Sequence, residues 1–381
     1  MEVTAMADQG MKSVQRSNFT DTFQLFYKHQ QLTKQTIIDE LALSRPTATA
    51  NLQKLIDRNL IIEAGQSSNE GRGRKAIAYS LKPTAFVALG AELFSDHVTL
   101  VAVGANEKTL YHTTFKLPFA NKTSYYLAVT SAIQSFTKQH HLNAKQIIGL
   151  GLGLQGLVSA DGTEVIYGKI LNFTGLTTEI FAQYLPYPVT FFHDADAVAI
   201  AEQHLSQQKE DAIYLSIGEH LGTAMMVGGQ IYHGSNGRSG TMEHISIDPE
   251  HGRLCYCGRR GCIETYVSGS ALLHGRTDTI TEFFEHLHDQ DQAVQLRWQS
   301  YLDHTAHAIN NLHMFADSPI ILAGEVARYM DQATITALHE RLTELSAFPE
   351  PKPYLQLGQA GQHPVAVGAA LPLLAAHIAH I

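Results

Sequence analysis

The sequence has few cysteines, no long apolar run and no apolar segment near its start. A membrane-spanning helix needs about twenty consecutive apolar residues, and no such run occurs, so we predict no membrane span. Residues 1–15 are polar and lack the apolar core of a secretory signal. Three clustered cysteines without such a signal predict a protein of the reducing cytoplasm, not a disulfide-stabilised one.

Charge is distributed unevenly along the 381 residues, whose length allows two or three domains. Residues 1–82 hold 11 Lys and Arg against 8 Asp and Glu, whereas residues 83–381 hold 16 against 28. A mildly basic head on an acidic body suits a DNA-binding module attached to a sensor domain. Because the basic excess is small, charge alone does not establish DNA binding.

The three cysteines lie within eight residues and follow a histidine, as a metal site requires. The four candidate ligands are His244, Cys255, Cys257 and Cys262. Three thiolates and one imidazole form a complete tetrahedral set for Zn²⁺, with no open position for water. Gly258 and Gly261 permit the tight turns that bring the sulfurs together. We therefore predict one structural zinc ion per chain, with three ordinary buried thiols as the alternative.

The residues around these ligands resemble the signature of a known family. Gly240-Thr241-Met242-Glu243-His244, followed by Cys-Tyr-Cys-Gly-Arg-Arg-Gly-Cys-Ile-Glu-Thr at 255–265, is similar to the ROK signature (repressors, open reading frames and sugar kinases). The resemblance implies that this loop carries zinc and sugar-binding side chains. It also implies a two-lobed, actin-like sugar-kinase fold over nearly the whole chain. Thr241 and Glu243 depart from the family pattern Gly-Glu-x-Gly-His.

Residues 1–82 predict a winged helix-turn-helix. Phe19, Phe23, Phe26 and Tyr27 form one helical face, Thr33 and Ser44 can cap two further helices, and Ala42-Leu43 forms the turn between them. Strands at 60–62 and 76–81 then flank a wing ending Gly-Arg-Gly-Arg-Lys. The residues expected to contact DNA are Ser44, Arg45, Thr47, Thr49 and Asn51 on the third helix, and Arg72, Arg74 and Lys75 in the wing. A solvated charge run is the alternative for the wing. The kinases of the family lack such a head.

From residue 83 onward, strands alternate with helices, which is typical of an α/β fold. We place the first actin-like lobe at residues 83–195 and the second at 196–381, with a last helix able to pack back on the first lobe. Strands are expected at 98–103, 109–115, 146–158, 188–193, 212–218, 223–227 and 319–323, and helices at 124–140 and 364–381.

Asp194 follows a buried strand, and ligands bind at the carboxyl ends of strands in open α/β sheets. The resemblance matches Asp194 to the family's general base, while His193 stands where asparagine is usual. A helix N-cap is the alternative for Asp194. The sugar-binding residues implied by the resemblance are Asn172, Asp194, His244 and Glu264.

The three nucleotide loops implied by the resemblance each contain an added acid. They read Glu-Leu-Phe-Ser-Asp at 92–96, Gly-Glu-His-Leu-Gly at 218–222 and Ala-Gly-Glu at 323–325. A carboxylate about 4 Å from a phosphate oxygen costs roughly 1 kcal/mol in water and more in a closed cleft. We therefore predict that the protein is not an enzyme.

Together these features predict a ROK-type repressor that binds double-stranded, palindromic operator DNA as a homodimer or tetramer. A small-molecule sugar or sugar derivative in the cleft between the lobes would be its effector. Two alternatives stay open: a sugar kinase with a DNA-binding head, and a regulator that answers to a protein partner and has a vestigial cleft.

Overall fold

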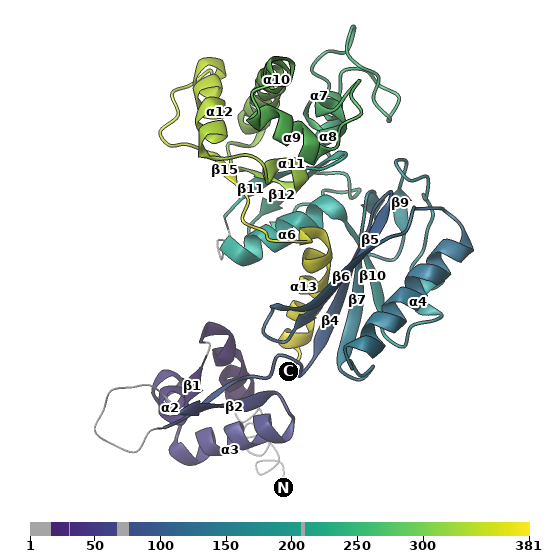
Figure 1. The fold of residues 1–381 in the computed structure, drawn as a ribbon. Coiled ribbons are helices and arrows are strands. Elements are labelled where there is room, and N and C mark those ends of the chain that lie inside the picture. The colour runs from purple at the N-terminus through teal and green to yellow at the C-terminus, as the bar shows by residue number, and fades with distance from the viewer. Residues whose placement is uncertain (1–16, 30, 67–75, 207–209) are drawn as a thin grey trace.

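The computed structural model describes residues 17–29, 31–66, 76–206 and 210–381. A small N-terminal head adjoins a larger body that contains two five-stranded sheets (Figure 1). Within these ranges, no helix combines the length and apolarity needed to cross a membrane.

The head consists of three helices and a three-stranded antiparallel sheet with the order β1-β3-β2. Its elements are a helix at 17–28, β1 (Leu32–Thr33), α2 (Lys34–Leu41), α3 (Arg45–Asp57), β2 (Ile61–Gln66) and β3 (Ile77–Leu81). The predicted caps are confirmed, because Thr33 accepts from the backbone N–H of Thr36 and Ser44 from that of Thr47. Ala42 ends α2 with φ 51°, the left-handed conformation that glycine adopts most easily.

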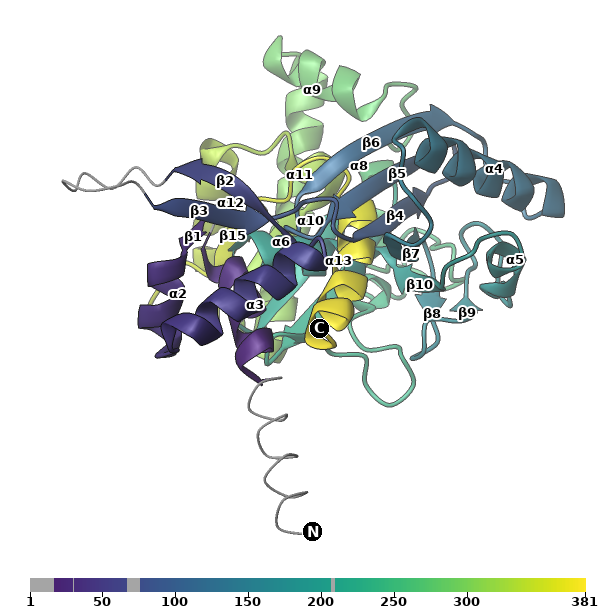
Figure 2. The same cartoon turned by 90° about the horizontal axis from the view of Figure 1, so that it is seen from below.

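One apolar core holds the head together and continues into the body. Phe23, Ile37 and Leu55 contribute one fully buried side chain from each head helix. The same cluster includes Phe86 and, on the C-terminal helix, Leu374. Figure 2 shows the head beside the C-terminal end of that helix, as does Figure 1.

The first sheet of the body has the order β10-β7-β4-β5-β6. Its strands are β4 (Val87–Leu93), β5 (His97–Gly104), β6 (Thr109–Lys116), β7 (Ile147–Leu154) and β10 (Val189–His193). β4, β7 and β10 are parallel, and β4, β5 and β6 form an antiparallel meander. α4 (Thr123–Gln139) packs on one face through Tyr126, Val129 and Ile133. α5 (Glu179–Ala182) and the short hairpin β8 (Leu157–Val158) and β9 (Val165–Tyr167) lie beside this sheet (Figure 1).

α13 (Pro364–Ala379) covers the other face of the first sheet. A methyl group at Gly90 would overlap the carbonyl of Ala366, and one at Gly151 would overlap that of Ala369. Glycine at these strand positions therefore lets the helix backbone approach the sheet closely. Gly153 lies against Val365 of the same helix, so it serves this packing as well.

The second sheet has the order β13-β12-β11-β14-β15. Its strands are β11 (Ala212–Ile217), β12 (Leu221–Val227), β13 (Gln230–Ile231), β14 (Ile320–Ala323) and β15 (Leu355–Leu357). The helical elements around it are α6 (Asp194–Ser206), η1 (Met242–His244), α7 (Glu264–Val267), α8 (Gly269–Leu272), α9 (Ile280–His288), α10 (Gln292–Ala316), α11 (Gly324–Ala327) and α12 (Gln332–Leu345). α6 packs against α13, so this helix pair lies between the two sheets (Figure 1).

The structure corrects the expectation that Asn51 faces DNA. Its side chain is only 4% exposed and donates hydrogen bonds to the Asn18 carbonyl at 3.0 Å and to Thr22 Oγ1 at 2.9 Å. Position 51 falls on the inner side of α3, beside Leu52 and Leu55, so its polarity serves the packing of the head. The wing residues Arg72, Arg74 and Lys75 lie outside the described residues.

Replacing Asn51 with alanine should therefore destabilise the head. The change removes the donor to the fully buried Thr22 hydroxyl and one of the donors to the Asn18 carbonyl, which lowers the free energy of unfolding by about 1–3 kcal/mol. Denaturant titration of the full chain measures this loss. Gln53→Ala, on the exposed side of the same helix, is the control and should change the value by less than about 0.5 kcal/mol. Equal effects of the two changes would contradict a packing role for Asn51.

Candidate functional site

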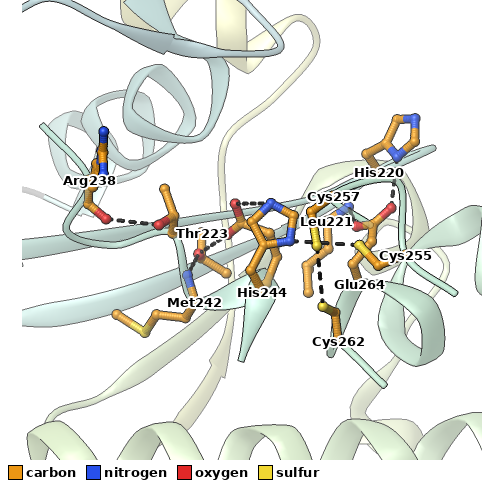
Figure 3. A network of polar contacts seen from close by, with 12 residues as sticks. His220, Leu221, Thr223, Arg238, Met242, His244, Cys255, Cys257, Cys262 and Glu264 are labelled. Atoms are coloured by element: carbon orange, nitrogen blue, oxygen red, sulfur yellow. Dashed lines mark hydrogen bonds and ion pairs between the residues drawn. The ribbon is translucent and has the colours of Figure 1, made fainter. Parts of the chain in front are cut away.

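Four potential metal ligands converge beside η1. The imidazole of His244 and the sulfurs of Cys255, Cys257 and Cys262 place their donor atoms within 4.8 Å of one another (Figure 3). Cys255 Sγ lies 3.7 Å from His244 Nδ1, and Cys257 Sγ lies 3.7 Å from Cys262 Sγ. The predicted grouping is thus present in the fold, and its residues can bind a metal ion.

The donor spacing fits one tetrahedral ion better than a disulfide. A sulfur–sulfur bond measures about 2.05 Å, whereas the Cys257 and Cys262 sulfurs are 3.7 Å apart and all three cysteines are free. Two thiolates bound at about 2.3 Å to the same tetrahedral ion would lie about 3.8 Å apart. The observed separation of these two sulfurs is therefore compatible with a shared ion.

Tight turns shape this loop, as the glycines predicted. Gly258 and Gly261 have φ values of 93° and 70°, which side-chain-bearing residues rarely adopt. A methyl group at Gly261 would also overlap the carbonyl of Asp248. The N–H of Cys255 donates to the Arg259 carbonyl at 2.8 Å, which closes a turn that contains Cys257.

Glu264 connects the cysteine loop to the turn between β11 and β12. It begins α7, two residues after Cys262, and is 4% exposed. Its Oε1 lies 2.7 Å from His220 Nδ1, and its Oε2 accepts from the N–H of Leu221 at 2.7 Å (Figure 3). Both carboxylate oxygens are therefore engaged within the protein. Glu264 is also predicted to bind sugar, and in this arrangement it positions His220.

A small pocket of about 60 Å³ lies between the two sheets, next to the cysteine loop. Its polar lining includes Gln155, Lys169, His193, Asp194, His220, Glu243 and His244. Tyr256, between two of the cysteines, also lines it, with its ring 5.4 Å from that of His220 and 5.1 Å from that of His244. Two of the predicted sugar-binding residues, Asp194 and His244, thus face the same cavity.

His193 and Asp194 form a charged group at the end of β10. His193 Nε2 is 3.3 Å from Asp194 Oδ1, and His193 Nδ1 is 3.6 Å from Asp196 Oδ1. Burial lowers the pKa of His193, but hydrogen bonding and charge from Asp196, together with Asp194, raise that pKa overall to about 9. The carboxyl groups of Asp194 and Asp196 therefore favour the protonated form of this imidazole, while burial raises the pKa of Asp194. Asp194, the first residue of α6, also accepts from the N–H of Ala195 at 2.9 Å.

Glu243 occupies the position of a glycine in the family pattern. Its side chain is 5% exposed, and its Oε2 accepts from Thr223 Oγ1 at 2.6 Å. Burial raises the pKa of this carboxyl group to about 7. Thr223 also accepts from the N–H of Met242 at 2.7 Å, so the replacement is built into the wall of the pocket (Figure 3).

The structure does not bring Asn172 to this pocket. Asn172 is exposed, has φ 53°, and uses its backbone carbonyl to accept from Asn121 Nδ2 at 2.6 Å. Lys169, three residues earlier, lines the pocket instead. Sequence reasoning also missed Gln155 and Tyr256. Tyr256 had a usable signal, because it lies between two predicted ligands, whereas nothing in the local pattern singled out Gln155.

A second cavity of about 570 Å³ adjoins the first and contains the three acid-bearing loops. Asp96 lies in the turn after β4, Glu219 in the turn after β11, and Glu325 in α11. Ser95 Oγ donates to Glu219 Oε2 at 2.9 Å, which joins the two turns across the cavity. Phe94 also lines this space. The loops predicted to converge are therefore together, and each brings a carboxylate.

Several known proteins are similar to this chain in sequence. The model of the ROK family matches residues 88–376. The DNA-binding transcriptional dual regulator NagC of Escherichia coli K12 is 27% identical over 265 residues, 68% of this chain and 64% of that protein. The xylose repressor of Bacillus spizizenii is 24% identical over 253 residues, 65% of this chain and 64% of that protein. The matched region thus spans less than two thirds of either relative.

Solved structures agree on the fold. A ROK family transcriptional regulator, described as a homolog of the E. coli MLC protein, covers 97% of this chain and 100% of its own, with a TM-score of 0.72 and 20% identity. A ROK family glucokinase from Streptomyces griseus, in complex with glucose and AMPPNP, covers 75% of this chain and 98% of its own, with a TM-score of 0.67 and 21% identity. The body therefore has the actin-like sugar-kinase fold. With a family match over most of its length, the chain belongs to the ROK family.

Proposed function

We propose that this protein is a ROK-type transcriptional repressor that binds operator DNA and responds to a sugar or sugar derivative, without kinase activity. One observation carries the proposal: the same chain joins a three-helix head to a sugar-kinase fold whose nucleotide-side cavity is lined with carboxylates. The similarity to a regulator over 97% of the chain supports this reading, as do the related repressors. Such a protein would act in the cytoplasm, where its DNA is.

The acids of the larger cavity argue against ATP as a substrate. Phosphoryl transfer depends on positioning and on stabilising negative charge. Asp96, Glu219 and Glu325 would instead add negative charge near the phosphates. The competing proposal is a sugar kinase with a DNA-binding head. It needs a test because a ROK family glucokinase has the same fold.

We propose residues 1–82 as a winged helix-turn-helix, residues 83–195 as the first lobe and residues 196–381 as the second. Arg45 and Thr49 are exposed on α3, and Ser44 caps its start, so the N-terminal end of this helix can enter a major groove. Arg72, Arg74 and Lys75 would contact phosphates from the wing. Proteins of this kind read palindromes as dimers, so we expect a homodimer or a tetramer.

Substitutions in the head should show which residues set the affinity for DNA in general and which set the preference for the operator sequence. Arg72→Ala with Arg74→Ala should weaken binding to every DNA and flatten its salt dependence, because fewer counterions are released. Thr49→Ala should instead reduce the preference for the operator over other sequences. Fluorescence anisotropy at several salt concentrations measures both effects. Lys138→Ala, exposed on α4 in the body, is the control. Identical behaviour of the two head variants would refute the assignment of helix and wing.

We propose that the four-ligand cluster binds one structural Zn²⁺. When bound, the ion would hold the cysteine loop, and through Glu264 the turn that carries His220. Three thiolates and one imidazole are ligands that zinc prefers, and they leave no position for a catalytic water. The protein's own contribution is the set of turns that bring the donors together.

Purified protein should therefore contain about one zinc per chain. Cys257→Ser should lower both the zinc content and the melting temperature, because metal binding contributes folding free energy. Arg259→Ala, an exposed change in the same loop, should leave both unchanged. Elemental analysis and thermal unfolding give the two readouts. A folded, metal-free wild type that keeps its melting temperature with chelator would rule the zinc site out.

The effector site is proposed at Asp194, with His193 and His244 beside it. A carboxylate at a strand end can accept two sugar hydroxyls without transferring a proton. An effector shifts the protein only if it binds one arrangement of the two lobes better than the other. The two sheets meet across the cleft and are joined by the helix pair α6 and α13. We propose that the effector changes the position of one sheet relative to the other.

Wild-type protein with ATP, Mg²⁺ and hexoses or amino sugars should show no phosphorylation above background.

Asp194→Asn should raise the effector concentration needed for operator release about tenfold or more, because hydrogen bonds to a charged group are worth about 1.5–3 kcal/mol each. It should leave operator binding by the free protein intact. A measurable rate of sugar phosphorylation would favour the kinase function. Release that needs a protein partner and no sugar would favour a vestigial cleft.

A further inference from the structure

The two cavities meet at Gln155, Asp194 and His220, which line both of them. The smaller one, about 60 Å³, has room for only a few waters, since each needs about 10–15 Å³. The larger one, about 570 Å³, falls within the usual range of about 300–1,000 Å³ for ligand pockets. A ligand that reaches Asp194 is therefore adjacent to a space large enough for another sugar ring.

Gln155 offers an unused hydrogen-bond acceptor at this junction. The residue is 6% exposed, and its Oε1 is buried without a hydrogen-bond partner among the described residues. Buried polar atoms in folded proteins are nearly always paired. Since Gln155 lines both cavities, rotation of its amide would bring this atom to a hydrogen-bond donor on a ligand that crosses the junction.

Carboxylates dominate the charge of the larger cavity. Five line it: Glu92, Asp96, Asp194, Glu219 and Glu325. Arg328 is the one arginine or lysine in its lining. Four of these acids already have partners. Asp194 is 3.3 Å from His193, Glu92 is 3.3 Å from His363, Asp96 is 2.6 Å from His97, and Glu219 accepts from Ser95 at 2.9 Å. Glu325 is exposed, and its carboxylate makes no hydrogen bond or ion pair within the described chain.

This lining selects against anions and in favour of cations. A phosphate or carboxylate in the cavity would be repelled by several acids at once, whereas an ammonium group is attracted to them and donates three hydrogen bonds. The charge of this cavity therefore suits a cationic ligand better than a nucleotide.

We propose that the effector is a sugar of at least disaccharide size, with one ring beside Asp194 and a second, amino-bearing ring in the larger cavity. This inference rests on the proposed sugar response and specifies its ligand. The Gln155 amide marks the crossing between the rings, and Glu325 provides a free carboxylate for the amine.

Calorimetry on the full-length protein tests the ligand class with matched probes. A β-1,4-linked glucosamine dimer should bind at least about tenfold more tightly than cellobiose, which is its neutral counterpart. Cellobionate, which bears a carboxylate, should bind more weakly than cellobiose. Glucosamine and glucose should differ from each other less than the two dimers do, because a single ring beside Asp194 carries no second ring and no second amine farther into the larger cavity. Equal affinity for one-ring and two-ring probes would overturn the inference.

Reversing one charge tests the position of the second ring. Glu325→Lys should lower the affinity for the glucosamine dimer about tenfold or more and change that for glucosamine little. Glu340→Lys, the same change at an exposed position of α12 outside both cavities, should affect neither. An unchanged dimer affinity in Glu325→Lys would overturn the inference.

Operator release separates this inference from the proposed function. If single-ring sugars release the DNA and the dimers do not, the second-ring inference fails and the sugar-responsive repressor stands. If no sugar of either size releases the DNA, both fail.

Discussion

The two hydrogen bonds of Glu264 are the contact on which the geometry of the cleft depends. One oxygen faces His220 and the other accepts from the backbone of Leu221, so a single buried carboxylate fixes the turn that separates the two cavities. Glu264 is itself held two residues beyond Cys262. Whatever fixes the cysteine loop therefore fixes the wall of the cleft. A carboxylate with both oxygens engaged in a buried site is stiff, since moving it would leave polar groups unpaired.

Much of the fold could be predicted because its signals are local. Thr33 and Ser44 cap helices by bonding within three residues, and the apolar runs at 98–103 and 188–193 became β5 and β10. The strand Val87–Leu93 was not predicted, since its small residues reflect close packing against α13. Asn51 was misplaced for a related reason. Its polarity suggested an outward face, whereas helical spacing puts it beside Leu52 and Leu55.

The residues of the candidate site could be predicted where they lie close together in the sequence, and less well where only the fold brings them together. Cys255, Cys257 and Cys262 share one loop, so their spacing predicted the cluster that the fold brings together. Gln155 ends a glycine-rich strand, and only the packing of two sheets brings it to the junction of the cavities. Asn172 matched a family position by its neighbours alone, and it is exposed and does not line the pocket. The roles in DNA and sugar binding remain predictions.

The position of α13 has a consequence for synthesis on the ribosome. The face of β4 and β7 that carries Gly90 and Gly151 is covered by the last helix of the chain, about 200 residues after β7 ends. At about 5–20 residues per second, that face waits on the order of 10–40 s for its cover. The first lobe therefore cannot complete its core until α13 has been synthesised. Truncation just before Ala366 would leave a bare sheet face that invites aggregation, even though every residue lining the cleft had been translated.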